Sequence, residues 1–520
     1  MKRPNFLFII TDQHRADYLG CAGHRIVKTP NIDAITANGT MFDRFHVAAP
    51  VCMPNRASLL TGRFPSAHGL RYNGCELSYR AATFTEVLKL GGYHTASIGK
   101  SHVQPMTEFA AEQRVDPAAL GLLQEAWHDD GEDYDHETPG RYSGNSPYQI
   151  KLPYYGYDHV DMVTGHGQDC NGHYLQWLRA KSPMADAWRD RVNQLPHNYV
   201  CPQAVRTPIP EELYPTSFVR DKAVQFIDDS AKDERPFFAF VSFPDPHHPF
   251  TPPGRYWDMY DPADFSVRLP YEAHHNPTPP MRWLHERWRE GKRVSGGQEA
   301  FMADERELRE AMALSCGMIT MLDDAVGEIV SALKRSGQYE NTVIVFNADH
   351  GDYLGDYNLL LKGGIMLRSI TNVPFIWSDP EDRTSRRSHT LASTIDLAPS
   401  IIERAGLKPY FGIQGESFLG ALQGAGAMRD RLMIEHQDNV ARMGFSKPCM
   451  ARTLLTDTHR LTIYQGENWG ELYDLQSDFD ESRNLWDDRD HAAIRASMIE
   501  ALAQEMMRNV DQSPRARRRA

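Results

Sequence analysis

Four short apolar runs in the chain end abruptly in polar or ionisable residues, and they lie at positions 6–10, 95–98, 237–243 and 342–346. Continuous apolar runs without alternation indicate strands that are covered on both faces, as in a parallel or mixed sheet between helices. In such sheets, ligands bind beyond the carboxyl ends of the strands. The pattern therefore predicts that one edge of the sheet carries the side chains that close the runs, namely Asp12, Lys100, His247 and Asp349.

Helical segments fit between these runs. Residues 83–90 and 308–334 stop at Gly91 and at Gly337, where glycine suits the cap of a helix, and residues 218–229 precede the third apolar run. Strands that alternate with helices are typical of the α/β class. The sequence therefore predicts a large mixed, mostly parallel sheet sandwiched by helices.

The chain changes character in three places. Residues 104–215 and 251–300 are rich in aromatic residues, His or Pro and show little periodicity, so we expect two lid-like insertions there. Beyond residue 405, short β-like stretches such as 460–464 and a final helix at 492–507 predict a smaller C-terminal α+β subdomain. The expected organisation is a catalytic α/β domain over 1–404 and a smaller subdomain with a tail over 405–520.

The charge balance limits the partners. The chain has 56 Lys and Arg against 69 Asp and Glu, which gives a net charge of −13. An acidic surface of this kind disfavours nucleic acid and anionic membranes, so neither is expected as a partner. An anion bound by this protein must therefore meet positive charge that is concentrated locally.

Cysteine usage and the N-terminus predict a cytoplasmic protein. The seven cysteines lack the close spacing of a disulfide framework, so we expect mostly reduced thiols. The N-terminal apolar run has only five residues before it closes at Asp12, which is too short for a signal peptide core or a membrane span. The insertions or the tail would mediate contacts if the chain forms a homo-oligomer.

The most informative motif starts at Cys52. Cys52, Pro54 and Arg56 stand at alternate positions, and Thr61-Gly62 follows. Pro54 suits the first turn of a helix, so Cys52 is expected at a helix N-terminus, where free N–H groups and the helix dipole favour negative charge. Taken alone, the motif predicts a thiol of lowered pKa.

With this motif the chain resembles the formylglycine-dependent sulfatase family of the alkaline phosphatase superfamily. The likeness extends over nearly all of the chain and includes TPNID (29–33), GKSH (99–102), PHHP (246–249), DHG (349–351), KG (362–363), STIDLAP (393–399) and ELYDL (471–475). The resemblance implies an alkaline phosphatase-like fold. It also implies that Cys52 is oxidised to formylglycine, which requires a formylglycine-generating enzyme as a partner during maturation.

The resemblance further implies one divalent metal ion, bound by an oxygen of the modified Cys52 and by Asp12, Gln13, Asp349 and His350. Many sulfatases carry Asp at the position of Gln13 and Asn at that of His350, so the set here is less anionic and includes a nitrogen. This weakens the case for Ca²⁺, the family default, and makes Mn²⁺ a close alternative. The same Asp-Gln and Asp-His pairs occur among phosphonate monoester and phosphodiester hydrolases, so the metal stays open.

A cationic pocket for the transferred sulfate is also implied, and its members are Arg56, Lys100, His102, His247 and Lys362. Arg and Lys hold anions by charge-assisted hydrogen bonds, which supplies the local positive charge that an acidic protein needs. The spacing in PHHP selects His247, and His248 is interpreted as structural. Asn73 either reaches the sulfate or serves as a turn residue, because Asn-Gly favours turns.

The expected chemistry has two steps. One hydroxyl of hydrated formylglycine attacks sulfur, with Asp349 as the candidate base, while His247, helped by Lys362, assists the departing alcohol or phenol oxygen. His102 then takes the proton of the second hydroxyl, so that sulfate leaves. A plain serine has no second hydroxyl for this step.

The leading interpretation is a sulfuric ester hydrolase, arylsulfatase-like or choline-sulfatase-like, that acts on a small-molecule sulfate ester. Lys100 and His102 favour it, because two cations suit a monoester that must be held without a second substituent. A phosphonate monoester or phosphodiester hydrolase on the same scaffold is the closest alternative. The other two hypotheses are a thiol hydrolase that uses unmodified Cys52 and a degenerate anion- or metal-binding protein.

Overall fold

The structure is a computed structural model that describes residues 3–108, 126–144, 146–293, 299–424 and 426–518. Its centre is a nine-stranded sheet with the order β12-β2-β11-β9-β1-β7-β4-β5-β6. β1 pairs in parallel with β7 and β9, and β4 pairs in parallel with β7 and β5, whereas β11 runs antiparallel to β9 and β2. The sheet is therefore mixed and mostly parallel, as predicted.

The four apolar runs form four neighbouring parallel strands at the middle of this sheet. They are β9 (Thr342–Ala348), β1 (Asn5–Thr11), β7 (Phe237–Ser242) and β4 (His94–Gly99). Because these strands are parallel, their carboxyl ends meet at one edge of the sheet. The outer strands are β2 (Thr40–Phe42), β5 (His159–Thr164), β6 (Asn171–Gly172), β11 (Phe375–Ser378) and β12 (Arg386–Ser388).

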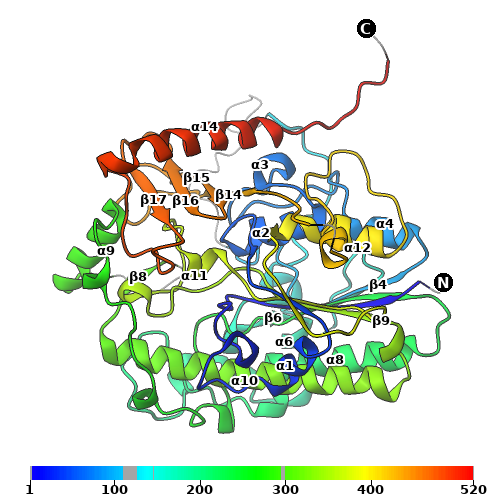
Figure 1. Ribbon diagram of the computed structural model, residues 1–520. Coiled ribbons are helices and arrows are strands. Elements are labelled where there is room, and N and C mark those ends of the chain that lie inside the picture. Colours follow the sequence, from blue (N-terminus) through cyan, green and yellow to red (C-terminus); the bar gives the residue numbers. More distant parts are fainter. Residues whose placement is uncertain (1–2, 109–125, 145, 294–298, 425, 519–520) are drawn as a thin grey trace, which may run out of the picture.

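Helices cover both faces of the sheet, which explains why its central strands read as unbroken apolar runs (Figure 1). Along β1, Phe6 and Phe8 join a core with α2, α4 and α12, whereas Leu7 and Ile9 join a second core with α1, α8 and α10. The covering helices are α1 (Pro30–Thr36), α2 (Cys52–Thr61), α4 (Phe84–Leu90), α8 (Pro215–Ser230), α10 (Glu305–Arg335) and α12 (Leu397–Arg404).

Shorter elements complete the main part of the chain. The helices are α3 (Pro65–His68), α6 (His173–Lys181), α7 (Ala185–Arg189), α9 (Pro279–Arg289), α11 (Arg368–Thr371) and α13 (Leu419–Leu422). Two small pairings join β8 (Phe301–Met302) to β10 (Leu359–Leu360) and β3 (Phe45–His46) to β13 (Ala392–Ser393).

A separate antiparallel sheet lies in the C-terminal part. It has the order β14-β15-β16-β17, with bounds Arg431–Gln437, Met450–Thr456, His459–Tyr464 and Gly470–Asp474. The long helix α14 (Ala492–Arg508) packs on one side of it (Figure 1). The expected smaller α+β element is therefore present, while a domain boundary at residue 404 stays a prediction.

The segment 104–215 is more regular than we expected. It contributes β5 and β6 to the main sheet, and α6 and α7 follow. The sequence analysis did not predict β5. This strand lies near the margin of the sheet, and His159 and Asp161 interrupt its apolar pattern although the end of the strand is buried. Residues 109–125 and 294–298 of the two expected insertions lie outside the described residues.

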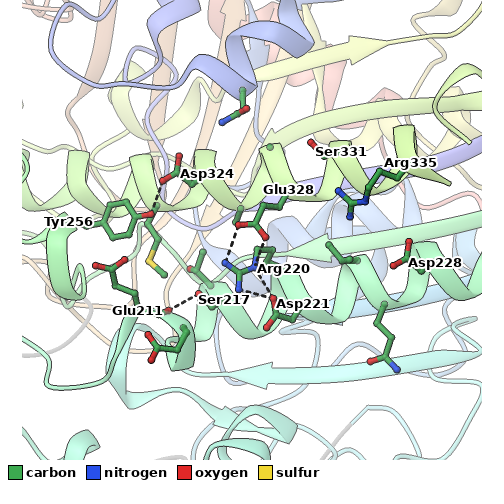
Figure 2. A pocket seen from close by; sticks show the side chains of 18 of the residues that line it. Glu211, Ser217, Arg220, Asp221, Asp228, Tyr256, Asp324, Glu328, Ser331 and Arg335 are labelled. Atoms are coloured by element: carbon green, nitrogen blue, oxygen red, sulfur yellow. Dashed lines mark hydrogen bonds and ion pairs between the residues drawn. The ribbon is translucent and has the colours of Figure 1, made fainter. Parts of the chain in front are cut away.

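A groove of about 1090 Å³ lies between α8 and α10 on the helical layer (Figure 2). Its lining includes Glu211, Asp221, Asp324, Glu328 and Arg220. None of the site residues expected from the sequence lines this groove. Among the described residues, no helix has the length and apolarity that crossing a bilayer demands.

Candidate active site

The site is built where α2 meets the carboxyl edge of the central strands. Cys52 is the first residue of α2 and is only 1% exposed, and every residue of this helix is buried. The Asn55 side chain accepts from the amide of Ala48 at 3.0 Å and donates to the carbonyl of Asp349. This side chain therefore joins the first turn of α2 to the end of β9 and places Cys52 beside the strand ends.

Four buried side chains from three separate segments converge at this point, namely Asp12, Cys52, Asp349 and His350. Their ligand atoms all lie within 4.8 Å of one another. The Nε2 atom of His350 is 3.0 Å from the sulfur of Cys52, 3.6 Å from Asp12 Oδ1 and 3.7 Å from Asp349 Oδ1. Asp12 and Asp349, which close two central strands, therefore lie together beside Cys52.

The chemistry of this donor set fits a divalent cation. His350 Nδ1 lies 2.8 Å from the carbonyl of Gly351, which selects the tautomer whose Nε2 lone pair faces the two carboxylates. Burial and Lys362 would lower the pKa of His350, but Asp349 and Cys52 raise it above its ordinary value. This corner of the site therefore favours positive charge, as a metal site requires.

Gln13 lies in the same place but faces other partners. Its backbone amide donates to Asp349 Oδ1 at 3.1 Å, and its side-chain oxygen accepts from Lys362 Nζ at 2.8 Å. The amide nitrogen lies 3.1 Å from His248 Nδ1 and also contacts Asp352. Gln13 therefore borders the cluster, and its role as a metal ligand stays a prediction.

Two of the expected cations surround the acids. Arg56 donates to Asp349 Oδ2 at 2.8 Å and lies 3.7 Å from Asp12 Oδ2, and Lys100 forms an ion pair with the same Asp12 oxygen. Burial alone would raise the pKa of Asp12, but Lys100 and Arg56 lower it well below its ordinary value. Asp12 is therefore held as a carboxylate inside the protein.

Lys362 connects the nucleophile position with His247. Its Nζ atom is 3.4 Å from Cys52 Sγ and 2.8 Å from His247 Nε2. Burial and Asp12 would raise the pKa of the Cys52 thiol, but Lys362, His350 and Lys100 lower it below its ordinary value. The thiolate character expected from the helix N-terminus therefore arises mainly from neighbouring cations.

His102 lies close enough to Lys100 and Arg56 to feel their charge, and Asn73 lies at the start of α2. The His102 backbone amide donates to Glu137 at 2.7 Å, and its buried Nδ1 has no hydrogen-bond partner. Burial and Lys100 hold the pKa of His102 well below its ordinary value, so the ring is neutral. Asn73 Oδ1 accepts from the amide of Met53 at 3.2 Å, which places it against the first turn of α2.

Sequence reasoning missed His166. Its Nε2 lies 2.6 Å from Lys100 Nζ and 3.7 Å from Asp12 Oδ2, and its ring stacks on His247 with 3.5 Å between centroids. His248 stacks on the other side of His247 at 4.1 Å. His166 follows β5 just as the other site residues follow their strands, so recognition of that strand would have revealed it.

The comparisons with known proteins agree with this geometry. The sulfatase family profile matches residues 4–407, and the profile for the C-terminal part of N-sulphoglucosamine sulphohydrolase matches residues 355–508. The first match covers well over half of the chain, and the chain therefore belongs to the sulfatase family. It is a hydrolase that acts on sulfuric esters.

Relatives are similar along most of their length. The chain is 28% identical over 508 residues to the uncharacterized sulfatase YidJ of Escherichia coli, covering 97% of this chain and 88% of that protein. It is 26% identical to an arylsulfatase of Clostridium perfringens, and the match covers 93% of this chain and 90% of that protein. Among solved structures, the phosphonate monoester hydrolase of Agrobacterium radiobacter is similar with a TM-score of 0.76 and 26% identity, covering 98% and 97%.

Proposed function

We propose that this protein is a metal-dependent, arylsulfatase-like hydrolase whose nucleophile is a formylglycine derived from Cys52. One observation carries the proposal. The Cys52 sulfur lies at the start of a buried helix, 3.0 Å from His350 Nε2 and 3.4 Å from Lys362 Nζ, and it also lies beside Asp12. Acids, an imidazole nitrogen and a cation therefore meet at the atom that would carry the reaction.

A divalent ion is assigned to the donors Asp12, Gln13, Asp349 and His350, together with an oxygen on modified residue 52. When bound, such an ion would neutralise charge on a sulfate oxygen and favour the ionised form of the nucleophile. Ca²⁺ is the family default, and Mn²⁺ is the close alternative because the imidazole of His350 and the amide of Gln13 replace harder anionic ligands.

The side chains around residue 52 divide the remaining work. Arg56, Lys100 and Lys362 hold the sulfate by charge-assisted hydrogen bonds, and Asn73 supports its binding from the first turn of α2. His247, with Lys362 at 2.8 Å from its Nε2, protonates or stabilises the departing oxygen. His102 is neutral and its buried Nδ1 is free of hydrogen bonds, which suits the base that takes the second hydroxyl proton.

Two partners follow from this assignment. A formylglycine-generating enzyme is required during maturation, because the gem-diol supplies the second hydroxyl that lets the sulfated intermediate collapse with release of sulfate. The substrate is a small-molecule sulfate ester, and the products are sulfate and an alcohol or phenol.

Mass spectrometry of the peptide that contains residue 52 tests the proposal. Formylglycine is expected at that position in active protein, and hydrolysis of an aryl sulfate is expected to disappear in Cys52→Ala. Cys201→Ser, which changes another buried cysteine, serves as the matched control and should remain active. An intact thiol at residue 52 in fully active protein would refute the formylglycine mechanism.

A second candidate is a phosphonate monoester or phosphodiester hydrolase. It is favoured by the likeness to the Agrobacterium radiobacter enzyme and by the Gln13 and His350 positions. Rates on an aryl sulfate and an aryl phosphonate, measured on one preparation, separate the two. A much faster phosphonate reaction would reverse the order of the candidates.

A further inference from the structure

A second cluster of metal-binding side chains lies in the C-terminal sheet, away from Cys52. It consists of His436, Asp438 and Cys449, whose ligand atoms all lie within 4.8 Å of one another. His436 is the penultimate residue of β14, Asp438 directly follows this strand, and Cys449 directly precedes β15. Neither the catalytic scheme nor the family motifs make use of these residues.

Strand register explains why the three side chains meet. β14 and β15 pair antiparallel with His436 opposite Ala451 and Gln437 opposite Met450, and the Asp438 amide continues the pairing to the Cys449 carbonyl at 2.8 Å. Asp438 and Cys449 are therefore cross-strand neighbours on one face, and His436 shares that face because it lies two residues earlier. Ala451, opposite His436, is small enough to leave room beside the ring.

Several polar atoms of this cluster have no hydrogen-bond partner. His436 is 3% exposed and Cys449 is 2% exposed, and both ring nitrogens of His436 and the Oδ2 atom of Asp438 lack a hydrogen-bond partner. A buried polar group without a partner costs free energy, so several at one place call for a ligand. A cation between them would satisfy a nitrogen and an oxygen at once.

Distances fit a tetrahedral ion. The Nε2 atom of His436 lies 3.3 Å from Asp438 Oδ2. Two ligands bound to Zn²⁺ at about 2.0–2.1 Å and at a tetrahedral angle stand roughly 3.3–3.4 Å apart. The separation therefore fits two ligands of one ion, and it equally fits a direct ion pair between protonated His436 and Asp438.

Gly364 borders the cluster. A Cβ atom at this glycine would lie 3.2 Å from the Met443 methyl group, 3.3 Å from Cys449 Sγ and 3.4 Å from His436 Nε2, so both ligand atoms face the same backbone position beside Met443. The segment is fixed by Tyr464, whose hydroxyl donates to the Gly364 carbonyl at 3.1 Å. Lys362 of the active site stands only two residues earlier, which links this cluster to the position of a catalytic side chain.

We propose that His436, Asp438 and Cys449 bind one Zn²⁺ ion, separate from the metal of the active site. A thiolate and an imidazole select zinc, whereas the carboxylate-rich active site suits a harder ion. Binding replaces the Cys449 thiol proton, which is released to solvent, and forms bonds to Sγ, Nε2 and Oδ2. The ion fixes the β14–β15 hairpin against the segment that follows Lys362.

Cobalt substitution provides the test. The experiment uses full-length protein with Cys52→Ser, so that no thiolate at the active site contributes to the spectrum. Titration with Co²⁺ is expected to produce a thiolate-to-cobalt charge-transfer band whose final intensity corresponds to one thiolate site per chain and which is displaced by Zn²⁺. Cys449→Ser should lose this band and bind Zn²⁺ roughly 100-fold more weakly or worse, because even outer-shell changes cost 10–100-fold.

The matched control is Cys316→Ser, which changes a cysteine that is equally buried but lies outside the cluster. It should keep the band unchanged. If Cys449→Ser does not fold, Asp438→Asn at the strand end replaces it and should weaken Zn²⁺ binding in the same direction. Folded protein that gives no charge-transfer band with Cys449 intact, or the same band without it, would overturn the proposal.

Discussion

Arg56 and Arg460 are both 1% exposed, and each lies between two carboxylates, yet the two regions have different purposes. Arg56 donates to Asp349 at 2.8 Å and lies near Asp12 at the carboxyl edge of the main sheet. Arg460 sits in the small C-terminal sheet, where it donates to Glu471 at 2.7 Å and to Glu481 at 2.5 Å. A buried arginine with paired acids therefore does not by itself identify an active site.

The residues around Arg56 and around Arg460 show how the two regions differ. Around Arg460, the Nη1 atom that donates to Glu471 also donates to the Thr462 hydroxyl at 3.0 Å, and the Tyr473 ring lies 4.6 Å from the guanidinium carbon. The second oxygen of Glu481 accepts from the amide of Arg368 at 2.7 Å. Both oxygens of Glu481 are therefore held by a structural network, whereas one oxygen of Glu471 and the Nη2 atom of Arg460 lack a hydrogen-bond partner. Burial raises the pKa of Glu481 above its ordinary value.

Around Arg56, in contrast, the acids share their oxygens with groups that have chemistry of their own. Asp12 faces Lys100, Cys52 and His350, and additional cations lower its pKa well below its ordinary value. The lesson is that function is indicated by an excess of converging charges at strand ends, whereas a balanced buried pair indicates stability.

The largest loss of activity is expected for Cys52→Ala. This variant removes the reacting group and leaves both buried arginines in place, so it separates activity from stability in the active-site region. Aryl sulfate hydrolysis should fall by roughly 10⁴-fold or more, since loss of a nucleophile removes the chemical step. The free energy of unfolding, measured in urea, should change by less than about 1 kcal/mol because the ion pairs of Asp12 and Asp349 with Arg56 and Lys100 remain. Retained turnover would mean that Cys52 is not the nucleophile position.

Arg460→Met should have the next largest effect, on stability. It leaves Glu471 and Glu481 buried without their partner, so the free energy of unfolding should fall by about 3–5 kcal/mol. The control is Arg483→Met, which changes an arginine that is 65% exposed and should shift stability by less than about 0.5 kcal/mol. An equal effect of the two variants would contradict the structural role of Arg460.

Arg56→Lys keeps the charge but loses the planar fork that reaches Asp349, Ser242 and the Lys100 carbonyl. We expect kcat to fall roughly 10²–10³-fold, a typical loss when one positioned donor is removed. Stability should fall by less than in Arg460→Met, because Lys100 and Lys362 still compensate the acids. Unchanged kcat combined with a large stability loss would make the two arginines equivalent.

The smallest effect concerns His274, which is 6% exposed and lies 3.0 Å from the Tyr473 hydroxyl. Burial lowers the pKa of His274 to about 4. The unfolded chain binds a proton near its ordinary value of 6.5 while the folded protein does not, so stability is full above that pH and is lost as pH falls toward 4.

His274→Gln should remove roughly 1–2 kcal/mol of this acid sensitivity, seen as a flatter curve of unfolding free energy between about pH 7 and pH 5. His389→Gln changes a histidine that is 80% exposed and should leave the curve as it is. An unaltered slope in His274→Gln would show that other groups carry the pH dependence.

Much of the fold could be predicted because its strongest signals are local. Unbroken apolar runs gave the central strands β9, β1, β7 and β4, and glycines marked the ends of α4 and α10 within a residue or two. β5 was missed because an outer strand needs fewer apolar residues. His166 was missed with it, since a histidine in an irregular stretch has no pattern that separates it from any other polar residue.

The sequence by itself determined which residues close the central strands and that Cys52 begins a helix, because apolar runs, Pro54 and the family motifs are properties of the chain alone. Only the tertiary structure decided which of these residues touch. Parallel pairing brings Asp12 and Asp349 together, and the register of β14 with β15 puts His436, Asp438 and Cys449 on one face. The physical reason is that such contacts depend on strand order and register, which are set by packing over the whole molecule.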